Sequence, residues 1–410
     1  MQIFVLTMLI MGLVGGQLTS LPFVAGIRVT LLDAAVMLML FYAAGQKSKK
    51  PIRLASFGKT QDRQGRRFIP PLWAPILGFG AVTIISLALT LGIVPTYVIG
   101  GGLLYVLRWL TYAALYWVAA GPLIAPGTWF VVLISSGIGI AGMGLVQYIW
   151  YPDLRNLYYL GWDPHYQRLF STLLDPNFTG IILGVTALML LTAAEARNYT
   201  AGKMIGLVMT IGALILTYSR SSLVAFGVGL LVFGILTKRK VFMVGITATI
   251  IAALLILPHT GEGRNLFRTV SSYARLGNAA RAMVLIREKP VFGHGFNLLR
   301  FVATERSWID EAVIPSRSGS GLDTSMLFVG ATTGAIGMLV YGWLIVRLFR
   351  LGISGLRGKD KVRIAAAGYI SVLAALMTHS LFINSLFYPW VMAWIWLSTG
   401  AMERHLTADR

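Results

Sequence analysis

The chain has 410 residues, of which 56% are hydrophobic and 12% are charged, and it contains no cysteine. Soluble domains carry about twice this share of charged residues, so the composition excludes an ordinary soluble globular protein, and the lack of cysteine excludes disulfides and thiolate chemistry. The net charge of +20 would indicate a nucleic-acid partner in a soluble protein, but in so apolar a chain it indicates basic loops beside a membrane and no nucleic acid.

Apolar stretches of membrane-spanning length recur along the whole sequence. A helix crosses the hydrocarbon with about 20 apolar residues, and continuous apolar runs argue against a barrel, which needs period-two alternation. We therefore predict an all-α, polytopic helical membrane protein that forms a single integral membrane domain over residues 1–410. The first stretch, Ile3–Val14, lacks a basic leader and a clear cleavage site, so we expect a retained helix. About twelve transmembrane helices are expected, near residues 2–18, 29–45, 69–91, 98–119, 128–150, 177–194, 204–219, 222–236, 241–257, 323–346, 364–383 and 386–401.

The loops between these helices divide into two sets that differ in charge. The loops of one set, with the C-terminus, hold 21 of the 35 Lys and Arg residues and five of the 15 acidic residues. Most basic residues of the other set lie in or beside one long loop, residues 258–322, and long loops are translocated largely regardless of their charge. The positive-inside rule therefore predicts cytoplasmic termini and a long extracytoplasmic loop over residues 258–322.

The stretch TYSRSS (residues 217–222) places one arginine among hydroxyl groups between two apolar runs. Residues 204–236 are too long for one transmembrane helix, so we expect a turn near Ser219–Ser222. This turn puts Arg220 at the outer membrane interface. There the arginine either reaches lipid headgroups from a helix end or lines a polar pocket.

The long loop supplies further arginines. Arg264, Arg268 and Arg275 recur at spacings that place them on one face of a helix. We expect Gly277 to end this helix and Asn278 to cap a second one, so that the loop carries short amphipathic helices. Such helices either lie on the membrane surface with their basic residues toward phosphates or line a substrate site.

The second helix of the loop would carry Arg281 in its first turn. The helix dipole disfavours a cation at that place, which indicates that a role other than helix stability selects this residue. Pro290 is expected to end the helix. The GHGFN stretch then forms a tight turn, in which we expect His294 to be structural or solvated.

Acidic residues occupy helix starts and the membrane interior. Asp323 opens the tenth helix and Asp175 opens the sixth, where such residues usually act as caps. Asp33 and Arg108 are costly charges inside the membrane, and they either pair with each other or serve a site. The sequence shows no nucleotide-binding loop and no His, Asp and Glu at metal-ligand spacing. We therefore expect neither a cofactor nor a metal.

Several outward-facing arginines and one carboxylate suit a substrate that carries a lipid diphosphate leaving group. Arginine forks clamp phosphate oxygens in pairs and would stabilise the charge that develops on the diphosphate. The carboxylate would take a proton from an attacking hydroxyl. This division of labour requires no metal.

Four stretches in this order resemble the O-antigen ligase and O-antigen polymerase superfamily over roughly residues 160–400, namely RLFSTLLDPNFTG, TYSRSS, NAARAMVLIREKPVFGHGFN and DTSMLFVGATTGAIG. Members are polytopic bacterial enzymes that act on undecaprenyl-diphosphate-linked glycans at the outer face of the inner membrane. The resemblance implies that Arg220 and Arg281 bind the donor diphosphate. It also implies that Arg168 and Asn177 lie in a turn that is structural or lines the substrate.

This chain departs from the ligase pattern at the start of the tenth helix. Ligases typically show a His-Asn pair there, whereas this chain has Asp323-Thr324. The resemblance therefore favours a polymerase in which Asp323 activates or positions the acceptor hydroxyl. Arg264, Arg268 and Arg275 would guide the lipid headgroup or the polymer.

The sequence thus predicts a metal-independent glycosyltransferase that polymerises polyprenyl-diphosphate-linked oligosaccharides of a surface polysaccharide. Its partners would be the glycan donor, a glycan acceptor, the lipid bilayer, and a chain-length regulator or flippase. One alternative is a ligase that transfers the glycan to a lipid or protein acceptor. Another is a transporter or flippase for an anionic glycolipid, which would show inverted repeats and broken helices with charges near the membrane midplane.

Overall fold

The computed structural model describes residues 1–23, 28–46, 72–239, 270–308 and 321–408, together with 244–245, 247–248 and 251. The helices of this part are α1 (Gln2–Gly15), α2 (Leu31–Gly45), α3 (Trp73–Ala88), α4 (Thr96–Ala120), α5 (Pro126–Trp150), α6 (Pro176–Arg197), α7 (Ala201–Leu216), α8 (Arg220–Thr237), α10 (Val270–Glu288), α11 (Leu299–Glu305), α12 (Ser325–Gly355), α13 (Asp360–Ser380) and α14 (Pro389–Ala408). Short 3-10 helices are η1 (Gly16–Thr19), η2 (Arg155–Leu160) and η3 (Ser171–Leu173), and two short strands, β1 (Leu21–Pro22) and β2 (Arg28–Val29), pair antiparallel.

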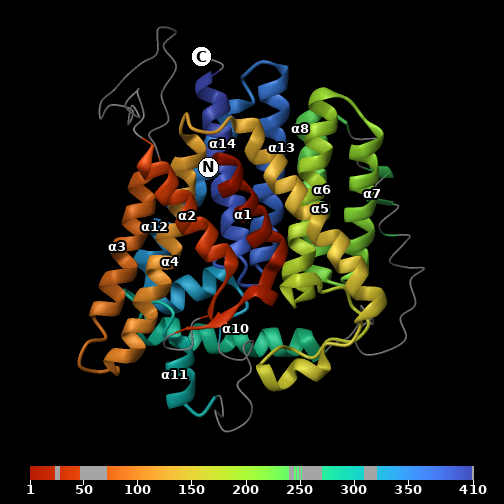
Figure 1. Cartoon of the computed structure of the whole chain (residues 1–410). Coiled ribbons are helices and arrows are strands. Elements are labelled where there is room, and N and C mark those ends of the chain that lie inside the picture. The colour runs from red at the N-terminus through yellow and green to blue at the C-terminus, as the bar shows by residue number, and fades with distance from the viewer. Residues whose placement is uncertain are drawn as a thin grey trace.

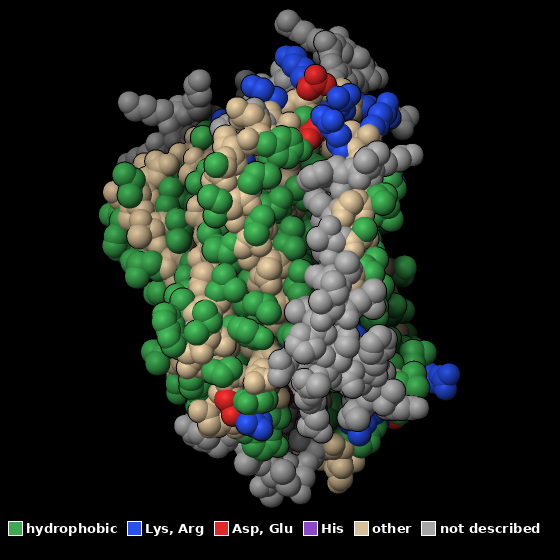
Figure 2. Space-filling model, turned by 90° about the vertical axis from the view of Figure 1, so that its right-hand side faces the viewer, with side chains coloured by type: hydrophobic (Ala, Val, Ile, Leu, Met, Phe, Trp, Pro, Cys, Tyr) green, Lys and Arg blue, Asp and Glu red, His purple; other side chains and the backbone are tan. Residues whose placement is uncertain are grey.

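Seven helices of the described chain are long and apolar enough to cross a membrane. They cover Gln2–Thr19, Thr96–Ala120, Pro126–Trp150, Pro176–Ala196, Arg220–Thr237, Ser325–Gly355 and Asp360–Ser380. Figure 2 shows a face whose middle is covered by hydrophobic side chains, while Lys, Arg, Asp and Glu gather at its two ends. This distribution matches the high cost of charge in hydrocarbon. The chain is an all-α polytopic membrane protein, as the sequence predicts.

Eleven of the twelve predicted helices coincide with helices of the structure, and the ninth, near residues 241–257, falls mostly outside the described residues. Seven of the eleven meet both the length and the hydropathy requirement for a membrane span. The other four, α2, α3, α7 and α14, are shorter or less apolar.

α13 and α14 form the centre of the bundle. α13 packs against α8 and α6, and α14 packs against α4 and α5 (Figure 1). Trp390 and Trp394 of α14 are fully buried. Because lipid tails are as apolar as the side chains, this association rests on close van der Waals packing.

α10 lies crosswise over one end of the bundle, and the start of α1 and the end of α14 lie toward the other end (Figure 1). The prediction that Gly277 ends a helix and Asn278 caps a new one is wrong, because α10 continues through both residues. A glycine inside a helix costs only about 1 kcal/mol relative to alanine, which is too little to break a helix that is held by its neighbours. Arg281 therefore lies in the middle of α10, and the dipole argument for its function does not apply.

α12 is broken in its interior. Gly334 has φ 66° and ψ −163°, a conformation that residues other than glycine rarely adopt. The loop after α10 fills the break, since Ala335 N donates to Pro290 O at 2.7 Å and His294 N donates to Ala331 O at 2.9 Å. The GHG turn thus anchors the end of α10 in α12.

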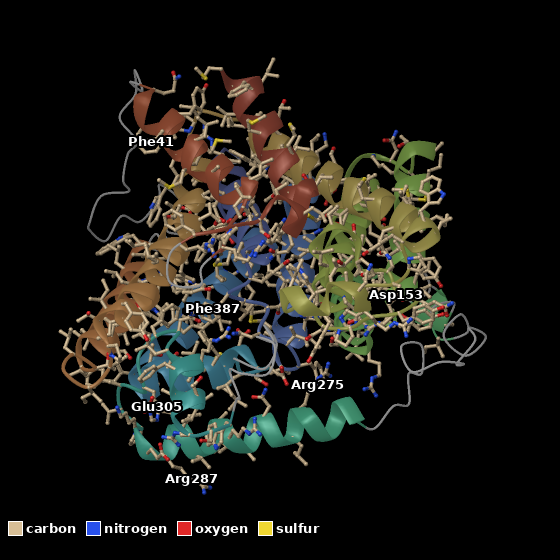
Figure 3. The ribbon with its side chains drawn as sticks, turned by 60° about the horizontal axis from the view of Figure 1, so that its bottom comes forward. Phe41, Asp153, Arg275, Arg287, Glu305 and Phe387 are labelled. Atoms are coloured by element: carbon tan, nitrogen blue, oxygen red, sulfur yellow. The ribbon has the colours of Figure 1, made fainter. Side chains whose placement is uncertain are left out.

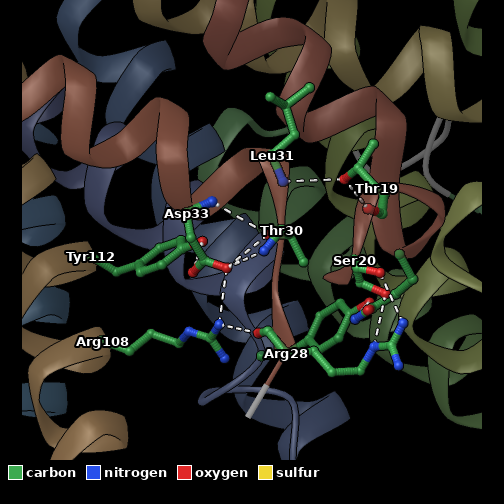
Figure 4. A network of polar contacts seen from close by, with 11 residues as sticks. Thr19, Ser20, Arg28, Thr30, Leu31, Asp33, Arg108 and Tyr112 are labelled. Atoms are coloured by element: carbon green, nitrogen blue, oxygen red, sulfur yellow. Dashed lines mark hydrogen bonds and ion pairs between the residues drawn. The ribbon is translucent and has the colours of Figure 1, made fainter. Parts of the chain in front are cut away.

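The two charges predicted inside the membrane, Asp33 of α2 and Arg108 of α4, pair with each other. Arg108 Nη2 lies 2.9 Å from Asp33 Oδ2, and both side chains are mostly buried. Asp33 also accepts a hydrogen bond from Tyr112 Oη at 3.1 Å and forms a capping box with Thr30, and Arg108 donates to Arg28 O (Figure 4). The pair therefore ties α2 to α4 and serves the fold.

Replacing Arg108 with Met should destabilise the protein by about 3 kcal/mol, because it leaves the Asp33 carboxylate buried without its counter-charge. Chemical unfolding in mixed micelles, followed by tryptophan fluorescence, measures the change. The double variant Asp33→Asn, Arg108→Met should recover most of the loss. The control Arg155→Met breaks an exposed ion pair with Asp153 and should cost less than about 1 kcal/mol. Equal losses in both single variants would contradict a stabilising role for the buried pair.

Candidate functional site

A tight turn, Thr217–Ser219, joins α7 to α8 at the place where the sequence predicts one. Tyr218 takes a left-handed conformation with φ 52°, and Ser219 caps α8 by accepting a hydrogen bond from Ser222 N at 3.4 Å. Arg220 is the first residue of α8 and is half-buried. The helix dipole disfavours a cation at this end, so helix stability does not explain this arginine.

A buried polar network behind Arg220 fixes the start of α8. Ser219 Oγ donates to Asn177 Oδ1 at 2.9 Å, and Ser222 Oγ donates to Asn177 O at 3.0 Å. Ser222 Oγ also lies 3.3 Å from Nε2 of His379, which is fully buried. A Cβ at Gly180 of α6 would lie 2.6 Å from Ser222 Oγ, so only glycine allows this approach. The serines thus join α6, α8 and α13 and position Arg220.

Arg275 of α10 lies within electrostatic range of both Arg220 and Asp323. Burial lowers the pKa of the Arg275 guanidinium, Asp323 raises it and Arg220 lowers it further. Burial raises the pKa of Asp323, and Arg275 opposes that change. Figure 3 shows Arg275 on the side of α10 that faces the bundle and Arg287 on the opposite side. Arg275 therefore lies between the influence of Arg220, at the start of α8, and that of Asp323, just before α12, at the end of the bundle that α10 crosses.

Asp323 does not cap α12. The N-cap residue is Thr324, and α12 begins at Ser325. Thr324 Oγ1 donates to Leu381 O at 3.1 Å, which ties this helix start to the end of α13. The cap interpretation of Asp323 is therefore wrong, whereas Asp175 does cap α6, because it accepts hydrogen bonds from Asn177 N and Phe178 N.

The other arginines predicted for the site lie elsewhere. Arg281 is exposed, and its guanidinium carbon lies 5.6 Å from the centre of the Trp308 ring. Arg264 and Arg268 fall outside the described residues. Arg275, which the sequence groups with these two, is thus the α10 arginine that accompanies Arg220.

Two further residues singled out in the sequence are buried and hold the chain in place. Arg168 is 1% exposed, and its Nε donates to Thr217 O at 2.9 Å, which supports the turn before Arg220. His294 Nε2 lies 3.1 Å from Leu285 O. His294 is buried, and burial lowers its pKa despite the carboxylate of Glu288 nearby. Of the two expected roles, structural or solvated, the structure supports the structural one.

The fold also assembles three residues that sequence spacing does not reveal as a group. Asp163, His165 and Asp175 each offer one ligand atom, and these three atoms lie within 4.8 Å of one another. All three side chains are half-buried. The sequence analysis found no His, Asp and Glu at metal-ligand spacing, whereas the fold brings these three side chains together. A signal was present in the short Asp163-Pro164-His165 stretch just before Asp175, but only the fold shows that they converge.

A family model described as O-antigen ligase matches residues 205–342. This stretch runs from α7 into α12 and includes Arg220, Arg275, Arg281 and Asp323. A search of curated proteins finds no match. The match supports the resemblance seen in the sequence motifs. Over residues 205–342 the chain is therefore similar to the O-antigen ligase family, and together with its membrane-spanning helices this match supports a multi-pass membrane enzyme of the glycan-transferring O-antigen ligase or polymerase type.

Proposed function

We propose that the protein polymerises oligosaccharide repeat units linked to undecaprenyl diphosphate, at the outer face of the bacterial cytoplasmic membrane. The observation that carries this proposal is that Arg275 faces the bundle from α10 and lies within electrostatic range of both Arg220 and Asp323 (Figure 3). Both termini would lie in the cytoplasm, and the α10 end would face outward. The product would be a surface polysaccharide.

The proposed reaction is a displacement at the anomeric carbon of the donor sugar. The oxygen of an acceptor hydroxyl forms the new glycosidic bond, and its proton passes to the Asp323 carboxylate. The bond from the anomeric carbon to the diphosphate oxygen breaks, and its electron pair leaves with the lipid diphosphate. Arg220 and Arg275 would bind phosphate oxygens and stabilise this growing negative charge.

The division of labour between the two arginines and the carboxylate explains transfer without a metal or cofactor in the chemical step. Arg281 is proposed to meet the donor farther along α10, where its stacking near Trp308 holds it at the surface. Arg264 and Arg268 would guide the lipid headgroup or the polymer before it reaches this point. A chain-length regulator or a flippase would be a further partner.

A ligase would use the same donor site with a different acceptor. The Asp323-Thr324 pair, in place of the His-Asn pair typical of ligases, favours the polymerase. A deletion strain distinguishes the two activities. Loss of the ladder of glycan lengths supports a polymerase, whereas persistence of free long polymer supports a ligase.

Replacing Arg220 or Asp323 with Ala should each lower glycan lengthening by about 100-fold or more, the size expected when a key electrostatic group is removed. The assay uses liposomes that contain the purified protein and a polyprenyl-diphosphate oligosaccharide, with product length read by gel electrophoresis. The control is Arg155→Ala, at an exposed residue that pairs with Asp153, and it should retain normal activity.

Each outcome of this assay bears on one part of the proposal. Near-normal lengthening by Asp323→Ala would remove Asp323 as the base. The protein could instead move the lipid-linked glycan across the bilayer and form no new glycosidic bond, even when candidate acceptors are supplied. That result would contradict the enzyme and indicate a transporter.

The pH dependence of kcat/KM should show an acidic limb from Asp323, at higher pH than an ordinary aspartate, because burial raises the pKa of this carboxyl. Arg275 opposes this rise. The variant Arg275→Gln should therefore move the limb to still higher pH, since less of the carboxylate is deprotonated at a given pH.

The matched control is Arg287→Gln, on the outward side of the same helix (Figure 3). It should leave the midpoint of the limb in place. A shift of the limb toward lower pH in Arg275→Gln, or an equal shift in both variants, would contradict the assignment of the limb to Asp323.

A further inference from the structure

We propose that Asp163, His165 and Asp175 bind a divalent ion of the first transition row, Mn²⁺ or Zn²⁺, beside the glycan-transfer site. One ligand atom from each residue lies within 4.8 Å of the other two. Two carboxylates and one imidazole suit these ions, whereas Mg²⁺ and Ca²⁺ favour ligands that are all oxygen. Three protein ligands also leave coordination positions open for water or a further oxygen.

The first two ligands come from a loop that is held rigidly before α6. Leu154 N donates to His165 O at 2.8 Å, and Gln167 N donates to Pro152 O at 2.8 Å. Pro164 restricts Asp163 to an extended conformation, and residues i and i+2 of an extended chain point to the same side. The loop therefore presents Asp163 and His165 together.

The third ligand comes from the fixed start of α6. Asp175 Oδ1 accepts both cap hydrogen bonds, from Asn177 N at 2.6 Å and from Phe178 N at 3.0 Å. These bonds set the orientation of the carboxylate and leave Oδ2 for a metal. A ligand on a helix start and two ligands on a pinned loop need little rearrangement to close around an ion, which favours binding.

The charges at this place also favour a cation. The carboxylates of Asp163 and Asp175 lie close together beside the His165 ring. A divalent ion would reduce the repulsion between the Asp163 and Asp175 carboxylates. We infer that the ion clamps the loop to α6 and sets the local charge, while the arginines carry out the chemistry.

The test is a Mn²⁺ titration of the full-length protein in detergent, after chelator treatment, followed by electron paramagnetic resonance. The wild type should bind one equivalent, and Zn²⁺ should compete for it. Asp163→Asn and His165→Gln should weaken binding by more than the roughly 10- to 100-fold typical of losing a residue that only supports a ligand. The control is Asp153→Asn, in the same loop but paired with Arg155, and it should bind Mn²⁺ like the wild type.

A second measurement, the unfolding temperature with and without Mn²⁺, tests binding even if a variant is less stable than the wild type. A ligand that binds the folded state raises the unfolding temperature, so Mn²⁺ should raise it for the wild type and for Asp153→Asn but not for His165→Gln. The absence of saturable binding in the wild type would overturn the proposal, as would equal binding by wild type, Asp163→Asn and His165→Gln. No glycan is present in these measurements, so their outcome is independent of the proposed glycan transfer.

Discussion

Charges in this chain have to be either paired inside the bundle or placed at its ends, because hydrocarbon cannot solvate them. Asp33 and Arg108 follow the first course, and their ion pair ties α2 to α4. Arg220, Arg275 and Asp323 follow the second, at a helix start, on the crosswise helix and just before another helix. The same constraint that shapes the fold therefore places these three charges at one end of the bundle.

The positions of the helices and of the Arg220 turn could be predicted from the sequence, because the length of an apolar run and the single arginine within it are local features. The continuity of α10 through Gly277 could not be predicted, because the packing of this helix against its neighbours outweighs the small cost of one glycine inside it. The break at Gly334 depends on the loop after α10, which lies about 40 residues earlier in the chain. The meeting of Asp163 and His165 with Asp175 depends on two segments that only the fold brings together.

The break in α12 bears on the choice between glycan transfer and transport. Discontinuous helices in transporters expose free backbone groups to substrate near the midplane. Here the break is filled, because Ala335 N and Ile336 N donate to Pro290 O and Val291 O. Ser86 Oγ of α3 also donates to Thr332 O at 2.6 Å. These backbone groups are thus used in holding the loop after α10 and are not free to bind a substrate. Arg220, Arg275 and Asp323 lie at the end of the bundle that α10 crosses, which favours a fixed site there over a transport path through the midplane.

The proposed acceptor base, Asp323, differs in its acid–base chemistry from a histidine. An imidazole titrates near neutral pH without help, whereas an aspartate of ordinary pKa is a weak base there and contributes little to proton transfer. Half-burial and the nearby Asp163 both raise the pKa of Asp323, and Arg275 opposes this rise. The arginine that would bind the leaving group therefore also tunes the base. When a donor diphosphate neutralises Arg275, that restraint weakens, so donor binding itself would make Asp323 a stronger base for the acceptor hydroxyl.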